Sequence, residues 1–180
     1  MTIIMEAHEI QLALEKSIEY YKKSLLEYSH DQFVAKPNDE EWSIGQMYEH
    51  VCISALYFFY KRATYCLEQR NGQIGGEKNV YGEKQFKYNS FPPTRLKIPD
   101  ALKGPEPIAR EKEIYLDLLD QIAIQGKILA EKILLDKGEY KCIQPAFGWL
   151  NAHEWYWMNE QHFRHHLLQK ERIDAFLSLR

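Results

Sequence analysis

Three of the seven histidines in this chain lie within five residues of one another, at positions 162, 165 and 166. Imidazole is the commonest metal-binding side chain in proteins, so this cluster is the first candidate for chemistry. On an α-helix, His162 and His166 point only about 40° apart and lie about one turn apart along the axis. Two imidazoles with that spacing can bind one divalent ion, as such pairs do in zinc enzymes. His165 lies about 100° around the helix from His166, so we do not expect it to share the ion.

The histidine pair lies on the apolar face of its predicted helix. The residues within about 60° of His162 on the helical wheel are Trp155, Met158, Asn159, His166, Gln169, Ile173 and Phe176. A single inward histidine is usually a core residue with a hydrogen-bonding partner, whereas an inward pair at this spacing favours a metal site. Gln169, one turn beyond His166, is a candidate to orient a bound ligand or water molecule.

A third ligand is expected, because two imidazoles alone rarely hold a divalent ion tightly. His50 is the best candidate, since it lies in the middle of a strongly apolar predicted helix, on the same face as Met47, Ser54 and Tyr57. The alternative is a core histidine bonded to a backbone carbonyl or a tyrosine hydroxyl.

The other titratable residues nearby are less suited to bind the same ion. Three point to other sides of their helices, namely Glu49, Cys52 and Glu160, and three lie near predicted helix ends, namely His8, His30 and His153. No carboxylate is therefore placed as a general base, which weakens the interpretation as a hydrolase.

Three neutral imidazoles would leave a divalent ion its full charge and an open coordination position. Such an ion lowers the pKa of bound water to about 7 or ionises a bound thiol. The pattern predicts a metal-dependent enzyme that activates a nucleophile towards a small-molecule substrate. If the nucleophile is water, the enzyme is a hydrolase. The other alternative is a non-catalytic bundle that binds a metal, a small ligand or a partner helix.

Four segments with helical periodicity must position these residues. They cover residues of about 4–29, 42–69, 108–135 and 151–179. Ser43 with Gln46, and Asn151 with Glu154, are typical of helix N-termini. The sequence thus predicts an all-α protein, a four-helix bundle with a long crossover between the second and third helices, as a single domain over residues 1–180.

The crossover, residues 70–107, is rich in glycine and proline and is longer than usual connections. Between Arg70 and Lys103 it holds seven Lys or Arg against three Asp or Glu. We interpret it as a solvated strap; the alternative is a lip that attracts anions over a pocket.

Composition excludes several classes of function. With 23 basic and 26 acidic residues the net charge is −3, which argues against a nucleic-acid partner. No apolar run approaches the roughly 18–20 residues that span a membrane, and the N-terminus does not resemble a secretory signal. The three cysteines form no CxxC pair, so we expect neither disulfides nor a cysteine zinc site, and a cytoplasmic location.

Two stretches resemble the DinB/YfiT-like superfamily of metalloenzymes. Residues 42–50, Trp-Ser-Ile-Gly-Gln-Met-Tyr-Glu-His, are similar to its second-helix start, which leads to a metal-binding histidine. Residues 147–151, Phe-Gly-Trp-Leu-Asn, followed by Glu154-Trp155 and by the His162, His166 and Gln169 pattern, resemble its last helix. The chain departs at His165, where many members have arginine, which leaves the ligands intact and changes their surroundings.

The resemblance implies a four-helix bundle with a divalent metal, often zinc or nickel, held by His50, His162 and His166. It also implies a homodimer, as in many members. Characterised relatives include S-transferases that use the low-molecular-weight thiols bacillithiol or mycothiol, and a mycothiol-dependent maleylpyruvate isomerase. A thiol S-transferase is therefore the function that we favour from the sequence.

Overall fold

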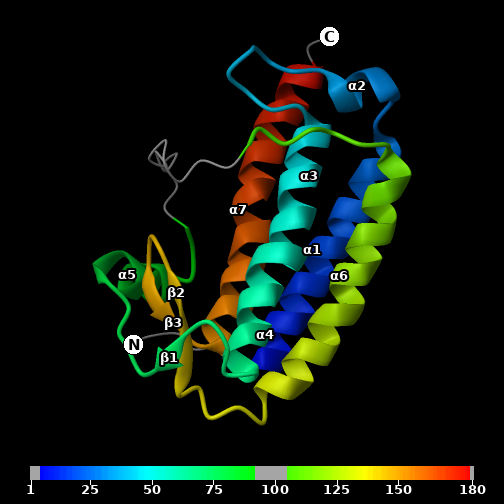
Figure 1. Ribbon diagram of the computed structural model, residues 1–180. Helices are drawn as coiled ribbons and strands as arrows, with labels where there is room; N and C mark the ends of the chain where they lie inside the picture. The colour runs from blue at the N-terminus through cyan, green and yellow to red at the C-terminus, as the bar shows by residue number, and fades with distance from the viewer. Residues whose placement is uncertain (1–4, 92–104, 179–180) are drawn as a thin grey trace.

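A computed structural model describes residues 5–91 and 105–178 and shows four long helical columns packed side by side (Figure 1). The columns are α1 (Ala7–Glu27), the continuous run of α3 (Ile44–Ser54), η1 (Ala55–Tyr60) and α4 (Lys61–Leu67), then α6 (Lys112–Ile133) and α7 (Ala152–Ser178). The predicted all-α four-helix bundle is confirmed, and the predicted helices match to within about one turn. In the described ranges, no helix is both long and apolar enough to cross a membrane.

The two predicted helix starts form the local hydrogen bonds that their residue types indicate. The Ser43 hydroxyl accepts from the backbone N–H of Gln46 at 3.2 Å, and the Gln46 side chain accepts from the Ser43 N–H at 3.0 Å. Asn151 and Glu154 form the same reciprocal pair at 2.9 and 3.0 Å. These pairs provide acceptors for backbone N–H groups that have no partner within the helix. They therefore fix the residues at which α3 and α7 begin.

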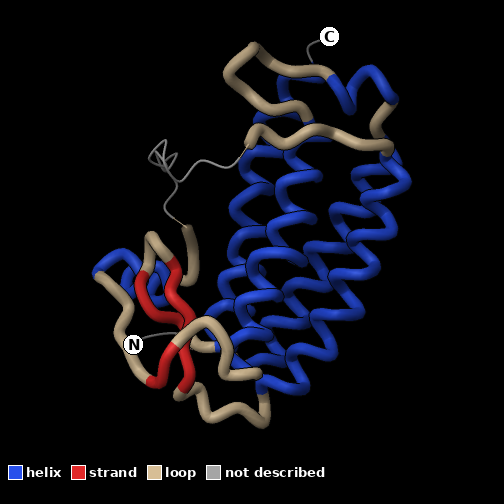
Figure 2. The backbone as a smooth tube through the Cα atoms, viewed as in Figure 1, coloured by secondary structure: helices blue, strands red, loops and turns tan. Residues whose placement is uncertain are grey.

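The interpretation of residues 70–107 as a plain strap is wrong, because this segment contains secondary structure. It holds β1 (Gln73–Ile74) and α5 (Val80–Tyr88). β1 joins β2 (Tyr140–Gln144) and β3 (Gly148–Leu150) in an antiparallel sheet of order β1-β2-β3, which lies beside one end of the bundle (Figure 2). Strands this short carry no periodic signal, and neither does the short helix α2 (His30–Val34). Residues 92–104 of the crossover lie outside the described residues.

The middle of α7 lies at the centre of the bundle. Every residue from Trp155 to Phe163 is buried, including the three aromatic residues at positions 155–157. One hydrogen bond that ties this stretch to another helix runs from the Tyr21 hydroxyl to the Phe163 carbonyl, at 3.0 Å. The three cysteines are buried and free, in agreement with the expected absence of disulfides.

A π-helical stretch, η1, interrupts the second column and changes which residues face α7. A regular α-helix would place Tyr57 on the same face as His50, but Tyr57 is 61% exposed. The wider π turn takes up an additional residue and rotates the following side chains. As a result Phe59, which is buried, lies against α7, with its ring 5.0 Å from that of His162.

Candidate metal centre

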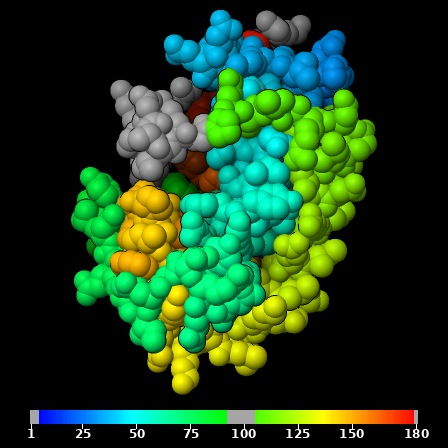
Figure 3. Space-filling view, viewed as in Figure 1, coloured from blue at the N-terminus to red at the C-terminus, as the bar shows by residue number. Residues whose placement is uncertain are grey.

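The three predicted histidines come together where α3 packs against α7. The Nε2 atom of His162 lies 3.0 Å from Nε2 of His50 and 3.1 Å from Nε2 of His166. One nitrogen from each of the three rings can be chosen so that all lie within 4.8 Å of one another. His165 is not in this group of potential ligands, as its place on the helical wheel predicts. The two elements that carry the group meet at a recess, where α7 is visible at depth beside α3 (Figure 3).

Hydrogen bonds alone do not satisfy these nitrogens. A neutral imidazole has a single N–H, and Nδ1 of His166 lies 2.8 Å from Oε1 of Gln169, an acceptor. The proton of His166 therefore sits on Nδ1, and the lone pair of its Nε2 faces His162. Nitrogens that bind zinc at about 2.0–2.1 Å in a tetrahedral site lie roughly 3.3 Å apart, close to the observed spacing. The three side chains thus fit a divalent ion.

Burial keeps these imidazoles in the neutral form that binds metals. Burial lowers the pKa of His50 to about 4, with a smaller contribution from His165. Burial also lowers the pKa of His162 and of His166 well below the usual value, and repulsion between the rings adds to the effect. The Gln169 contact opposes this shift at His166. At neutral pH all three rings are therefore neutral, and each has one nitrogen with a free lone pair. A metal ion can bind there without first displacing a proton.

A family model for the DinB superfamily matches residues 13–169, which include all three histidines and most of the bundle. The chain belongs to the DinB superfamily. No curated protein matches the sequence significantly.

Aromatic rings surround the histidine group of this DinB-superfamily chain. The Trp42 ring lies 5.0 Å from that of His50, and the rings of Phe59 and Phe91 lie 5.0 and 6.1 Å from that of His162. His165 packs on Phe91 at 5.4 Å, at the edge of the group. Sequence reasoning missed Phe59, which a regular helix would place elsewhere, and Phe91, which follows an unpredicted helix.

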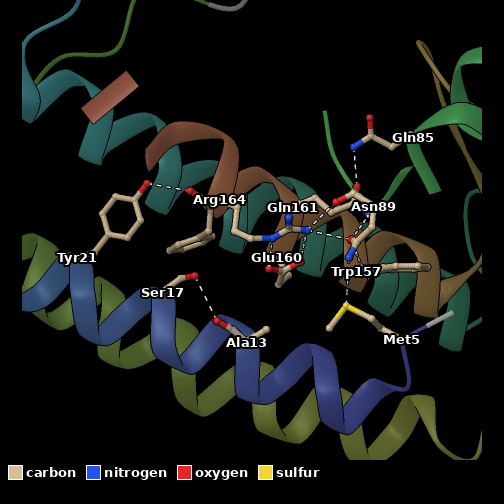
Figure 4. A network of polar contacts seen from close by, with 11 residues as sticks. Met5, Ala13, Ser17, Tyr21, Gln85, Asn89, Trp157, Glu160, Gln161 and Arg164 are labelled. Carbon is tan, nitrogen blue, oxygen red and sulfur yellow. Dashed lines mark hydrogen bonds and ion pairs between the residues drawn. The ribbon is translucent and has the colours of Figure 1, made fainter. Parts of the chain in front are cut away.

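The carboxylates close to the histidines in the sequence, Glu49 and Glu160, are hydrogen-bonded to other side chains. Glu49 accepts from Arg110 at 2.8 Å and from the Tyr115 hydroxyl at 3.0 Å. Glu160 is 1% exposed and accepts from Arg164 at 2.5 and 3.0 Å (Figure 4). Both turn away from the histidines, as predicted.

The basic residues of the crossover are only partly described. Arg70 and Lys78 form ion pairs with Glu68 and Glu154, whereas Lys84 and Lys87 are exposed. The other three, Arg95, Lys97 and Lys103, lie outside the described residues.

Proposed function

We propose that His50, His162 and His166 bind a divalent ion, zinc or nickel, and that the protein transfers a low-molecular-weight thiol to a small electrophilic substrate. The observation that carries this proposal is the convergence of three neutral imidazoles in a DinB-superfamily bundle, with Nε2 of His162 at 3.0 Å from that of His50 and 3.1 Å from that of His166. A bound ion of this kind would supply the positive charge that ionises a thiol or acidifies water.

A thiol is favoured over water because of what surrounds the histidines. A hydrolase gains from a carboxylate or another base that takes a proton from water. Among the described residues, the potential ligand group contains histidines only, and the neighbouring Glu49 and Glu160 are held by arginines. A thiol gives up its proton far more readily than water and needs no such base.

The side chains around the group would position the nucleophile rather than react with it. Gln169 holds the ring of His166 through Nδ1. Trp42, Phe59 and Phe91 present apolar rings around the histidines, which limits water and suits an apolar electrophile.

The first test is the metal content of protein purified without chelators, for wild type, His166→Ala and His165→Ala. We expect about one divalent ion per chain in wild type and in His165→Ala, and almost none in His166→Ala. His165 is the matched control, because it is adjacent in sequence and outside the potential ligand group. No ion in wild type, even after incubation with zinc or nickel, would contradict the proposal.

The second test measures the consumption of monochlorobimane by metal-loaded protein with and without bacillithiol, mycothiol or related thiols. Consumption that needs both thiol and metal supports the S-transferase. Turnover of model esters or amides without added thiol would favour a metal-dependent hydrolase. If azide and thiols leave the spectrum of the cobalt-substituted protein unchanged, no exchangeable position exists and the site is not catalytic.

The homodimer and the cytoplasmic location stay predictions. Gel filtration with light scattering tests the first, since it measures the mass of the assembly directly.

A further inference from the structure

Most of the unpaired buried polar atoms in the described part of the chain lie on one stretch of α7. They are Nδ1 of His162, both amide atoms of Asn159 and the Tyr156 hydroxyl; the remaining one is Oε1 of Gln85. Buried polar atoms are normally paired, so a cluster of unpaired ones next to a candidate metal centre calls for a functional explanation.

The unpaired atom of His162 is the nitrogen that faces away from the other two imidazoles. Its Nε2 points at His50 and His166, so binding an ion there requires the proton to sit on Nδ1. A buried N–H at that position needs an acceptor, and an acceptor in turn selects the tautomer that binds metal.

Asn159 is the best-placed source of this acceptor. It precedes His162 by three residues, so the two Cβ atoms lie about 5–6 Å apart on neighbouring turns. Tyr156 is two turns away, about 9 Å along the axis. Gln85 lies on α5, with its amide nitrogen bound to the Gln161 side chain at 2.5 Å.

The surroundings of Asn159 leave its amide oxygen available. Neither amide atom of Asn159 has a hydrogen-bond partner, so its oxygen is available to a donor. The nearby Tyr60 hydroxyl does not compete for this oxygen, because it donates to the Ile122 carbonyl at 3.1 Å.

On the other side of the group, Gln169 is an amide that already contacts the Nδ1 atom of a histidine. Its amide oxygen lies 2.8 Å from Nδ1 of His166, three residues away on the same helix. We propose that Asn159 is the corresponding positioning residue for His162, and that its Oδ1 accepts the Nδ1 proton. The two atoms are not hydrogen-bonded in the structure, so the contact requires a rotation of the Asn159 side chain or one bridging water. Both kinds of contact fix the same tautomer of His162. This inference rests on the proposed metal site and adds a residue that supports it.

The test compares wild type with Asn159→Leu, which removes the acceptor, and Asn159→Asp, which keeps one. Long-range 1H–15N spectra of metal-free protein report the tautomer of His162, and cobalt(II) titration reports metal affinity. We expect the Nδ1–H tautomer in wild type and Asn159→Asp, and a mixture of tautomers in Asn159→Leu. Cobalt affinity falls about 10–100-fold in Asn159→Leu and stays within about threefold in Asn159→Asp.

Gln85→Leu is the matched control, because it also removes a buried amide with an unpaired oxygen. It should leave both the tautomer of His162 and the cobalt affinity unchanged. Asn159→Leu protein that retains the wild-type tautomer and affinity would overturn the inference. If wild type binds neither cobalt nor zinc, the proposed function fails, whereas the tautomer comparison still decides the role of Asn159.

Discussion

Two polar clusters on α7 lie within one turn of each other and differ in how their atoms are satisfied. In the first, Arg164 donates to both oxygens of Glu160 and to the side-chain and backbone oxygens of Asn89 (Figure 4). In the second, the imidazoles of His162 and His166 turn their Nε2 atoms towards each other and towards His50. The first cluster matches donors with acceptors and positive with negative charge, whereas in the second three neutral imidazole rings turn their Nε2 atoms towards one another.

The comparison separates a structural network from a ligand site. The Arg164 cluster is closed, because Asn89 also accepts from the Trp157 indole at 2.9 Å and caps α5 in a left-handed conformation. It holds α5 against the bundle and needs nothing from outside. In the histidine group the Nε2 atoms face one another and Nδ1 of His162 has no partner, an arrangement that suits a bound cation. Removing residues from the two clusters should therefore have opposite consequences.

The largest effect is expected at Arg164. Arg164→Leu leaves the buried Glu160 carboxylate without its charged partner, which should lower the free energy of unfolding by about 3–5 kcal/mol. Urea unfolding measures the loss. Cobalt binding by the folded protein should change little; a loss of binding without a loss of stability would show that the two clusters are not independent. Arg164→Lys, which keeps the charge, should recover part of the stability.

Removing a histidine should weaken metal binding and leave the stability of the metal-free protein nearly unchanged. His162→Ala should weaken metal binding by more than the roughly 10–100-fold effect of a supporting residue, because it removes a ligand itself. It should leave the unfolding of metal-free protein nearly unchanged, since it also removes an unpaired buried nitrogen. A large loss of metal-free stability would instead indicate that the histidines serve the core.

A smaller effect is expected in how the stability of the metal-free protein depends on pH. Because burial lowers the pKa of the three histidines in the folded state, the unfolded chain binds more protons below its own histidine pKa near 6.5. The free energy of unfolding of metal-free protein should therefore fall as the pH drops from about 6.5 towards 4; His50, whose pKa is lowered to about 4, accounts for about 2–3 kcal/mol of this loss, and His162 and His166 act in the same direction. Urea titrations at pH 7 and pH 5 test this. A variant with all three histidines replaced by glutamine should lose most of the dependence.

The smallest effect is expected at Gln169. Gln169→Leu removes the acceptor that orients His166 and should weaken cobalt binding by about tenfold, at the low end for such partners. Gln169→Glu keeps an acceptor and should bind nearly as tightly as wild type. Equal affinity in all three proteins would mean that ring packing alone orients His166.

Much of the bundle could be predicted from local patterns in the chain. The four helices follow from apolar residues repeated at three- and four-residue steps, and the starts of α3 and α7 from Ser43 with Gln46 and Asn151 with Glu154. The pairing of His162 with His166 is likewise a property of one helix. Such features depend on residues within one or two turns of each other, so the order of the residues suffices to determine them.

Contacts between distant segments required the folded chain. His50 lies beside His162 only because α3 packs against α7. The π turn of η1 places Phe59, and not Tyr57, next to His162, which the helical wheel does not predict. The sheet, α5 and Phe91 were not predicted, because short strands and a nine-residue helix gain their stability from the bundle they pack on. Gln169 is close to His166 in the sequence, but only the folded chain shows that its amide oxygen lies on Nδ1 of His166, at 2.8 Å.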